Sequence, residues 1–304
     1  MRKAVVIWGL SAVLLAGAGM LRAGDFEDQL KKALDPLKQL KNQGSKPKPE
    51  ETTKPSESQA APAIPPVGQV PLEQEVKIGR QIAGNLLGAA PLVPDPKLQR
   101  YVNSVGRWVA SRSTRPDLNW TFGVIESNDI NAFAAPGGYV FITRGLYVKL
   151  KDEAELAGVL GHEIAHVQQK HHLKILQKQQ LIGLGSELLG RQIGGGDQTQ
   201  KLIGSGAEIM ARGLDKSAEF EADRMGVVLA VRAGYDPWAL PTVLQELATV
   251  SKGDSSVALL FKTHPSPEER LTQLGDAMGD RLDGIKAGQT LSQRFYELNT
   301  ATKK

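Results

Sequence analysis

The sequence predicts an α+β domain that is mostly helical and contains one small antiparallel sheet. Two observations support this fold class. Apolar residues recur at helical spacing on both sides of a central stretch, residues 119–143, where they alternate as in strands. Pro136-Gly137-Gly138 divides that stretch with a turn signal. The predicted helices flank the strands instead of alternating with them, which is typical of α+β folds.

Ordered structure is predicted to begin near Pro71. Residues 72–88 and 97–112 have the apolar period of amphipathic helices. Residues 119–126 alternate as one strand, and residues 130–143 read as two strand-like pieces. The first half of the domain is therefore expected to supply the sheet.

The second half is expected to be helical. A long helix is predicted from Asp152 to Gln179, and a Gly-rich stretch follows at 183–213. Further helices are predicted at Ser217–Ala233, from Asp236-Pro237 onward, and at 267–278, where Pro267 favours a helix start.

The N-terminus carries an export signal. Met1-Arg2-Lys3 is a positive cap before the uncharged, largely apolar run Ala4–Leu21, and small residues around Ala16 and Ala23 suit cleavage. Cleavage is favoured, and a retained membrane anchor is the alternative, because the run reaches the short limit for a span. In either case the positive flank places the rest of the chain across the membrane, in the periplasm.

These features divide the chain into four parts. They are a signal peptide or anchor at 1–23, a short helix (26–41) and a Pro-rich linker (43–69) within 24–70, a folded domain at 71–280, and a C-terminal tail at 281–304.

Composition excludes several function classes. The chain has no cysteine, which excludes disulfides, thiolate metal sites, cysteine nucleophiles and cysteine-linked lipid anchors. Its net charge of +4 depends on the N-terminus. Without Arg2, Lys3 and Arg22, 34 basic residues face 33 acidic ones, so the remaining chain is almost neutral. Neither charge nor motif indicates nucleic-acid binding.

The stretch GHEIAHVQQKHH, residues 161–172, holds four of the five histidines. His162 and His166 are four residues apart on the predicted helix and point only about 40° apart. Two imidazole nitrogens can therefore reach one zinc ion at about 2.0–2.1 Å. Glu163, beside the first ligand, is placed to accept a proton from activated water. The pattern indicates two metal ligands and a general base.

The other two histidines of this stretch fail the same geometric test. On a continuous helix, His171 points about 180° away from His162, and His172 about 280° away. We therefore interpret both as solvated residues of the helix's later turns.

A catalytic zinc needs a third protein ligand, and the pair Glu219 and Asp223 can supply it. The two carboxylates are four residues apart on one face of a predicted helix. Glu219 can bind the metal, and Asp223 can accept the remaining N–H of a ligating histidine and fix its tautomer. His264, the one histidine outside the opening stretch, is the alternative third ligand.

Four ordered motifs resemble a known family. HEIAHVQQKH, EFEADRMG, THPSPEERL and, upstream, NAFAAPGGYVFITRGL are similar to the zinc metallopeptidases that include the CAAX prenyl proteases and HtpX. The resemblance covers about residues 72–275, and it is greatest to the soluble periplasmic branch with BepA and YggG.

The resemblance implies a gluzincin (zincin-like) fold with one Zn²⁺ per chain, held by His162, His166 and Glu219, with Glu163 as the base. It also places Asn131 and His264 near the metal on the substrate side. Arg270 is expected to pair with an acidic group such as Asp223. His264 has two competing roles: a donor to the developing oxyanion, or a resting ligand that keeps the protease latent.

The leading functional interpretation is a periplasmic zinc metalloendopeptidase that cleaves unfolded or misassembled envelope proteins. Its substrates are expected to pair with an edge strand, Gly138–Thr143, through main-chain hydrogen bonds. Possible partners are the outer-membrane assembly machinery, with membrane contact only through an uncleaved N-terminal segment. The alternative is a non-enzymatic zinc-containing chaperone or binding module, although a structural site has no need of Glu163.

Overall fold

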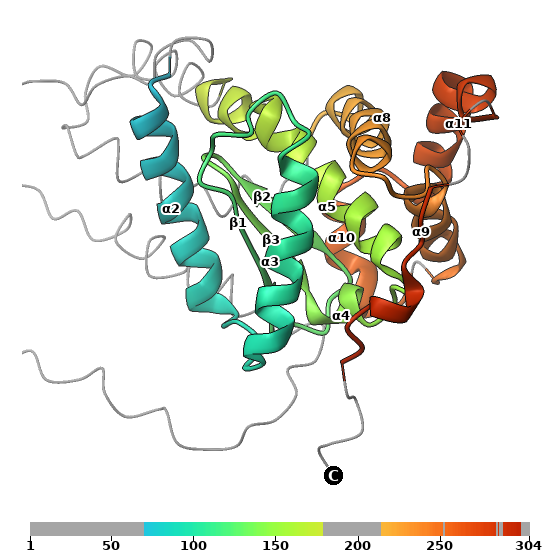
Figure 1. The fold of residues 1–304 in the computed structure, drawn as a ribbon. Helices are drawn as coiled ribbons and strands as arrows, with labels where there is room; N and C mark the ends of the chain where they lie inside the picture. Colours follow the sequence, from blue (N-terminus) through green and yellow to red (C-terminus); the bar gives the residue numbers. More distant parts are fainter. Residues whose placement is uncertain (1–69, 179–213, 252, 284, 286–287, 299–304) are drawn as a thin grey trace, which may run out of the picture.

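The computed structural model describes residues 70–178, 214–251, 253–283, 285 and 288–298 (Figure 1). Predictions for the segments 1–23, 26–41, 43–69 and 183–213 lie outside the described residues. Within the described ranges, no helix combines the length and apolar character needed to cross a bilayer.

Two helices precede the sheet, as the apolar period predicts. Helix α2 (Leu72–Ala89) is followed by α3 (Pro96–Ala110). Asp95 caps α3, because its side chain accepts hydrogen bonds from the backbone N–H groups of Lys97 and Leu98. Pro96 at the first helical position needs no donor there.

The sheet has three strands, β1 (Thr121–Ile125), β2 (Ala132–Ala135) and β3 (Tyr139–Thr143), in the order β1-β3-β2. β2 and β3 form an antiparallel hairpin around Gly137 and Gly138, both at positive φ, whereas β1 runs parallel to β3. The prediction of an antiparallel sheet is therefore wrong for one of its two pairings. Alternation of apolar and polar residues reveals strands, but it does not reveal the order in which they pair in a sheet.

The same strand order corrects the expected substrate-binding edge. Gly138–Thr143 coincides with β3, which is the central strand and has its backbone paired on both sides. The edge strands of the described sheet are β1 and β2.

Both faces of the sheet are buried, which explains why its strands are apolar throughout. Phe122, Val124, Val140 and Ile142 face the core formed with α3 and α5 (Glu153–Gln168). Side chains of the opposite parity, including Phe133 and Phe141, pack against α2. Figure 1 shows α3 in front of the sheet and α2 at its other side.

The other labelled helices lie beside α5, on the side away from α2 (Figure 1). In chain order they are α4 (Arg144–Tyr147), α8 (Lys216–Arg232), α9 (Ala239–Thr249), α10 (Ala258–Thr263) and α11 (Pro267–Asp283), with 3-10 turns at Ser255–Val257 and Ser292–Arg294. Helix α5 packs against α3 and the sheet on one side and against α8 and α9 on the other. It is consequently buried along nearly its whole length.

Helix α5 is shorter than predicted. It ends at Gln168, and Lys170 adopts a left-handed conformation with φ 56°. The chain then becomes helical again over residues 171–178. The expected continuous helix Asp152–Gln179 is thus two helical segments separated by a tight turn.

Helices α5 and α8 cross at a glycine pair. A Cβ atom on Gly161 would lie 2.8 Å from the backbone oxygen of Gly226, and one on Gly226 would lie 2.8 Å from the backbone nitrogen of His162. The two backbones approach this closely only because both residues lack a side chain. The crossing lies one residue before His162, so it sets the distance between the two helices at the functional cluster.

Residues 288–298, part of the expected C-terminal tail, pack on the domain. Arg294 pairs with Glu153 at the start of α5. The Tyr296 hydroxyl donates to Asp95, and the Tyr147 hydroxyl donates to the backbone oxygen of Tyr296. The segment therefore joins the beginnings of α3 and α5.

Candidate active site

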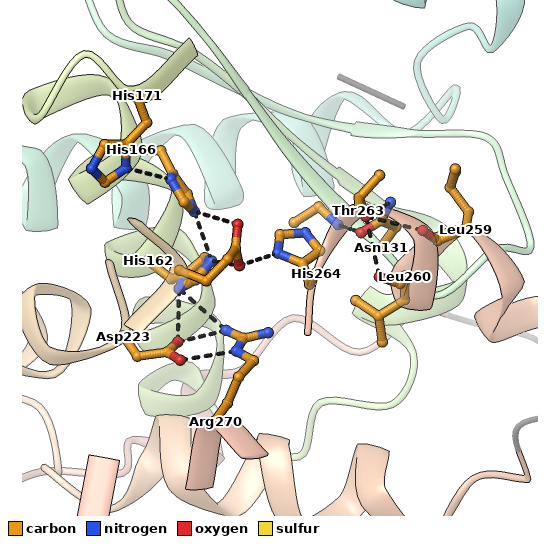
Figure 2. Close-up of polar contacts among 12 residues, drawn as sticks. Asn131, His162, His166, His171, Asp223, Leu259, Leu260, Thr263, His264 and Arg270 are labelled. Atoms are coloured by element: carbon orange, nitrogen blue, oxygen red, sulfur yellow. Dashed lines mark hydrogen bonds and ion pairs between the residues drawn. The ribbon is translucent and has the colours of Figure 1, made fainter. Parts of the chain in front are cut away.

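Four side chains from three elements converge on one point. His162 and His166 come from α5, Glu219 from the first turn of α8, and His264 from the residue after α10. One donor atom from each lies within 4.8 Å of the other three. Figure 2 shows the three imidazoles directed toward one another. Residues separated by more than 100 positions are thus brought into one cluster.

The spacing of these atoms suits a single metal ion. His162 Nε2 lies 3.0 Å from His166 Nε2, and each lies 3.6 Å from an oxygen of Glu219. A tetrahedral ion with bonds of about 2.0–2.1 Å separates its ligands by about 3.3–3.4 Å. Buried Oε1 of Glu219 has no hydrogen-bond partner among the described residues. A buried carboxylate that faces two imidazoles and keeps one oxygen, Oε1, without a partner is an environment that a cation satisfies.

An ion pair between Asp223 and Arg270 holds His162 at its Nδ1 atom. This atom lies 2.8 Å from Asp223 Oδ1. Arg270 from α11 holds the same carboxylate through Nε at 2.9 Å and Nη2 at 2.5 Å. This is the pairing that the resemblance implied for Arg270 (Figure 2). An Nδ1–H donated to Asp223 leaves Nε2 free to bind a metal.

His264 lies in the cluster itself. Its backbone is extended, with φ −129°, as expected for a residue before proline. Its Nδ1 is 2.5 Å from Glu219 Oε2, a hydrogen bond that is shorter than the spacing of two ligands on one ion. The side chain is nearly buried, with 9% of its surface exposed. The structure therefore brings both candidate third ligands, Glu219 and His264, to the same place.

Glu163 and Asn131 line the space beside the cluster. Both line a recess shared with His162 and His264. Asn131 is fully buried, its Nδ2 donates to Thr263 Oγ1 at 3.4 Å, and its Oδ1 accepts from the backbone of Ala132. It thereby connects the start of β2 to the residue before His264.

A second, narrow cleft runs along the edge strand. Glu163, His166 and Glu219 line it together with Ala132, Phe133 and Ala134 of β2. Its volume is about 20 Å³, which is room for about one water molecule. An extended peptide does not fit in this conformation.

His171 and His172 are not solvated, which corrects the sequence interpretation. His171 is 3% exposed and His172 is 9% exposed. The left-handed turn at Lys170 reverses the direction that a continuous helix would have given them. His171 Nδ1 lies 2.8 Å from His166 Nδ1, and its Nε2 lies 3.4 Å from Glu221 Oε2. Figure 2 draws the contact between the two rings. Neither belongs to the group that could hold the metal.

Burial and charge set the protonation tendencies of the cluster. Burial lowers the pKa of His166 well below its ordinary value, and neighbouring imidazoles lower it further. Burial raises the pKa of Glu163, which favours a carboxylate able to hold a proton. Burial also raises the pKa of Asp223, but Arg270 outweighs it and the net shift is downward. Asp223 is thus ionised and His166 neutral, as metal binding requires.

A wider, open cavity lies elsewhere. It measures about 800 Å³ and is lined by α3, the residues that follow α8, Glu153, and side chains from the segment 288–298. Its buried carboxylate, Glu153, already accepts hydrogen bonds from Tyr101, Tyr235 and Arg294. No set of metal ligands among the described residues lies there. Size alone therefore does not identify the functional site.

Sequence reasoning missed two features of the site. One is the glycine pair at the α5–α8 crossing, although a glycine directly before the first histidine and another three residues after Asp223 were visible signals. The other is the contact of His171 with His166. No glycine or proline marks the turn at Lys170, so the pattern carried no signal for it.

Comparison with known proteins places this geometry in a family. Residues 96–277, more than half of the chain, match Peptidase family M48. The chain is 33% identical over 232 residues to the "Beta-barrel assembly-enhancing protease" of Escherichia coli K12, covering 71% of this chain and 47% of that protein. It is 28% identical over 186 residues to the "Mitochondrial metalloendopeptidase OMA1" of Arabidopsis thaliana, covering 61% and 37%.

The chain spans about half the length of the first curated relatives it matches. The "Putative beta-barrel assembly-enhancing protease" of Vibrio cholerae, for example, is 31% identical over 223 residues, which are 69% of this chain and 46% of that protein. The family match and this level of identity agree with the cluster on α5 and α8. The chain belongs to peptidase family M48, a family of metal-dependent peptide hydrolases.

Proposed function

We propose that this protein is a zinc-dependent endopeptidase that hydrolyses peptide bonds of unfolded or misassembled envelope proteins. The observation that carries the proposal is the convergence of His162, His166 and the orphaned Glu219 oxygen beside Glu163. The two imidazoles and the carboxylate are a donor set typical of catalytic zinc.

The proposed chemistry assigns each residue one task. His162 and His166, through Nε2, and Glu219 hold Zn²⁺, which supplies Lewis-acid activation of water and of the peptide carbonyl. Glu163 accepts the proton of the attacking water on a carboxylate oxygen and passes it to the departing amine. Asp223 keeps the proton of His162 on Nδ1, and Arg270 holds Asp223 in place.

Substrate recognition is proposed at β2, replacing the expected strand Gly138–Thr143. β2 is an edge strand of the described sheet, and Ala132–Ala134 line the cleft that Glu163 and His166 also line. An extended peptide added along this strand would place a main-chain carbonyl beside the cluster. Recognition by main-chain hydrogen bonds suits unfolded substrates of varied sequence.

His264 is proposed to act as a resting ligand. His264 belongs to the group of side chains that could hold the metal, and the cleft beside it has room for about one water. A fourth protein ligand would fill the coordination position that hydrolysis requires. Movement of the Thr263-His264-Pro265 turn would then open the site, which suits an exported protease of unfolded chains.

The cellular setting is proposed from two sources. The N-terminal signal favours export to the periplasm, with tethering by residues 4–21 if the signal is retained. Relatives of which this chain covers about half are named for β-barrel assembly. We therefore place its substrates among envelope proteins and its partners at the outer-membrane assembly machinery.

Glu163→Gln tests the enzymatic proposal. Glutamine keeps size and hydrogen bonding but cannot take a proton, and loss of a general base costs about 10²–10⁴-fold in rate. Purified wild type should cleave casein in a chelator-sensitive manner, and the variant should bind zinc but lose cleavage to that extent. Near-normal cleavage by the variant contradicts the mechanism. Chelator-insensitive binding of unfolded casein by both proteins, without cleavage, would favour the non-enzymatic chaperone.

A further inference from the structure

His171 follows the metal-binding motif by five residues, and nothing above gives it a task. It is 3% exposed, and its ring stands edge-on to that of His166, with centroids 5.0 Å apart. Its Nδ1 is 2.8 Å from the Nδ1 of His166. This is the nitrogen of His166 that points away from the ligand cluster.

The distance between the two Nδ1 atoms requires that they share one hydrogen. At 2.8 Å one nitrogen must carry a hydrogen and the other must offer a lone pair. When His166 Nε2 binds a cation, its Nδ1 carries the hydrogen. His171 Nδ1 must then be the acceptor, so the hydrogen of His171 resides on Nε2.

The far side of His171 agrees with that assignment. Its Nε2 faces the carboxylate of Glu221, with 3.4 Å to Oε2. Gln169 fixes this carboxylate by donating to Oε1 at 2.6 Å. A carboxylate beside Nε2 favours the tautomer that keeps the hydrogen there and leaves Nδ1 as an acceptor.

The arrangement parallels the one behind His162. There the acceptor is Asp223, held by Arg270; here it is His171, held by Glu221. Both acceptors direct the Nε2 lone pair of a ligand toward the same point. The left-handed turn at Lys170 is what brings His171 back against His166.

We propose that His171 is a positioning residue that accepts the Nδ1 hydrogen of His166 and thereby fixes this ligand's tautomer and ring orientation. The inference deepens the proposed zinc site and rests on it. Loss of an acceptor behind a metal-bound histidine typically weakens metal affinity by about 10–100-fold. His171 itself binds no metal.

Three substitutions of His171 separate the loss of its hydrogen-bond acceptor from a change in packing. His171→Asn places Oδ1 where Nδ1 of the imidazole lies, so it can still accept from His166. His171→Leu has the same number and branching of heavy atoms as asparagine but offers no acceptor. His171→Gln reaches the Nε2 position toward Glu221 but not the Nδ1 position. Zinc dissociation constants are measured by competition with a chromophoric chelator, and folding of each metal-free variant is checked by thermal unfolding.

The expected result is a loss of zinc affinity of about 10–100-fold for His171→Leu and His171→Gln, with most of it restored in His171→Asn. Equal losses of zinc affinity in all three variants would give His171 only a packing role. Unchanged affinity in all three would give it no role in zinc binding. Either result overturns the inference while the zinc site stands.

A second measurement uses only the wild-type protein, so it does not depend on the folding of a variant. In zinc-loaded protein with ¹⁵N-labelled histidines, a shared hydrogen gives a scalar coupling between the Nδ1 nuclei of His166 and His171. Its detection supports the inference, and its absence in protein that binds one zinc overturns it. Failure of wild type to bind zinc overturns both this inference and the proposed metal site.

Discussion

The two histidines of α5 differ in what lies behind each ring. His162 donates toward a buried carboxylate, Asp223, whereas His166 faces a neutral imidazole, His171. A carboxylate acceptor raises the basicity of the ligand more than a neutral one does, because it stabilises positive charge on the ring. His162 is therefore expected to be the stronger ligand, and Arg270 compensates the charge that Asp223 adds.

Removing a proposed ligand should remove the metal. His162→Ala, His166→Ala and Glu219→Ala each leave at most two of three protein ligands besides His264, so we expect zinc to be lost on dialysis against a weak chelator. Metal analysis of the purified proteins measures the stoichiometry. His172→Ala is the matched control, because this buried histidine lies outside the ligand group. Full zinc occupancy in Glu219→Ala would remove Glu219 as third ligand.

Substitution of His264 should raise basal activity. Without a resting ligand the open position is permanently available, so we expect His264→Ala to cleave casein faster and to digest itself during storage. The double variant with Glu163→Gln controls for contaminating proteases. A drop of about 10²–10³-fold would instead assign His264 as an oxyanion donor, and unchanged activity would leave it neither role.

At the scale of elements, the active site depends on how closely α5 and α8 approach. The two proposed ligands on α5 and the one on α8, Glu219, can share one ion only if the two backbones nearly touch at Gly161 and Gly226. The atoms opposing a new side chain at Gly226 are backbone atoms of His162, which cannot move without displacing the ligand itself.

Gly226→Ala tests this coupling of packing to metal binding. Overpacking at a tight contact typically costs about 1–3 kcal/mol of unfolding free energy. We expect that loss in denaturant unfolding of the metal-free protein, accompanied by weaker zinc binding. Gly84→Ala is the control, since no atom lies within 4 Å of its added Cβ and alanine favours the helix. Unaltered stability and affinity in Gly226→Ala would show that the helices can separate freely.

Periodicity predicted most of these elements, because it reports which side of an element is buried. The helices α2, α3 and α8 and the three strands lie where the apolar pattern put them. Pairing order is a tertiary property, so the pattern could not show that β3 is central and parallel to β1. The proposed strand for substrate recognition is consequently β2 and not Gly138–Thr143.

The spacing of the metal motif likewise located its own residues but not their neighbours. His162, Glu163 and His166 follow from helical geometry alone, whereas His171 was assigned to solvent because the helix was assumed to continue. The turn at Lys170, whose positive φ is unfavourable for a residue other than glycine, decides that His171 lies against His166 and not in solvent. Such a turn is held by surrounding contacts and carries no local signature.

At the scale of the molecule, residues 288–298 hold the start of α5 in place. Glu153, at the first position of α5, accepts hydrogen bonds from Tyr101, Tyr235 and Arg294. Burial raises the pKa of Glu153, but the hydrogen bonds from Arg294, Tyr235 and Tyr101 outweigh it, so the net shift is downward from 4.5. The carboxylate is more stable as an anion in the folded state than in the unfolded chain.

This shift predicts the pH dependence of stability. A carboxyl with a lowered folded-state pKa contributes stability that is full above its unfolded pKa and is lost as the pH falls through the folded one. Glu153→Gln should lower the unfolding free energy at pH 7 by about 1–3 kcal/mol, and the difference from wild type should vanish once the pH falls below the lowered folded-state pKa of Glu153. Thermal unfolding across pH measures it. Glu126→Gln, in a partly exposed pair with Arg144, should change little. A difference that persists in acid contradicts the account.

The contact between His162 and Arg270 spans 108 positions of the chain. At synthesis rates of about 5–20 residues per second, that interval takes roughly 5–20 s. During that time the nascent polypeptide already carries the proposed base Glu163 and gains the proposed ligand Glu219, but it still lacks the arginine that holds Asp223. A chain truncated before α11 would therefore contain all the proposed metal ligands and Glu163, but not the guanidinium that holds Asp223 behind His162. The order of residues along the chain leaves the support of His162 incomplete until α11 has been made.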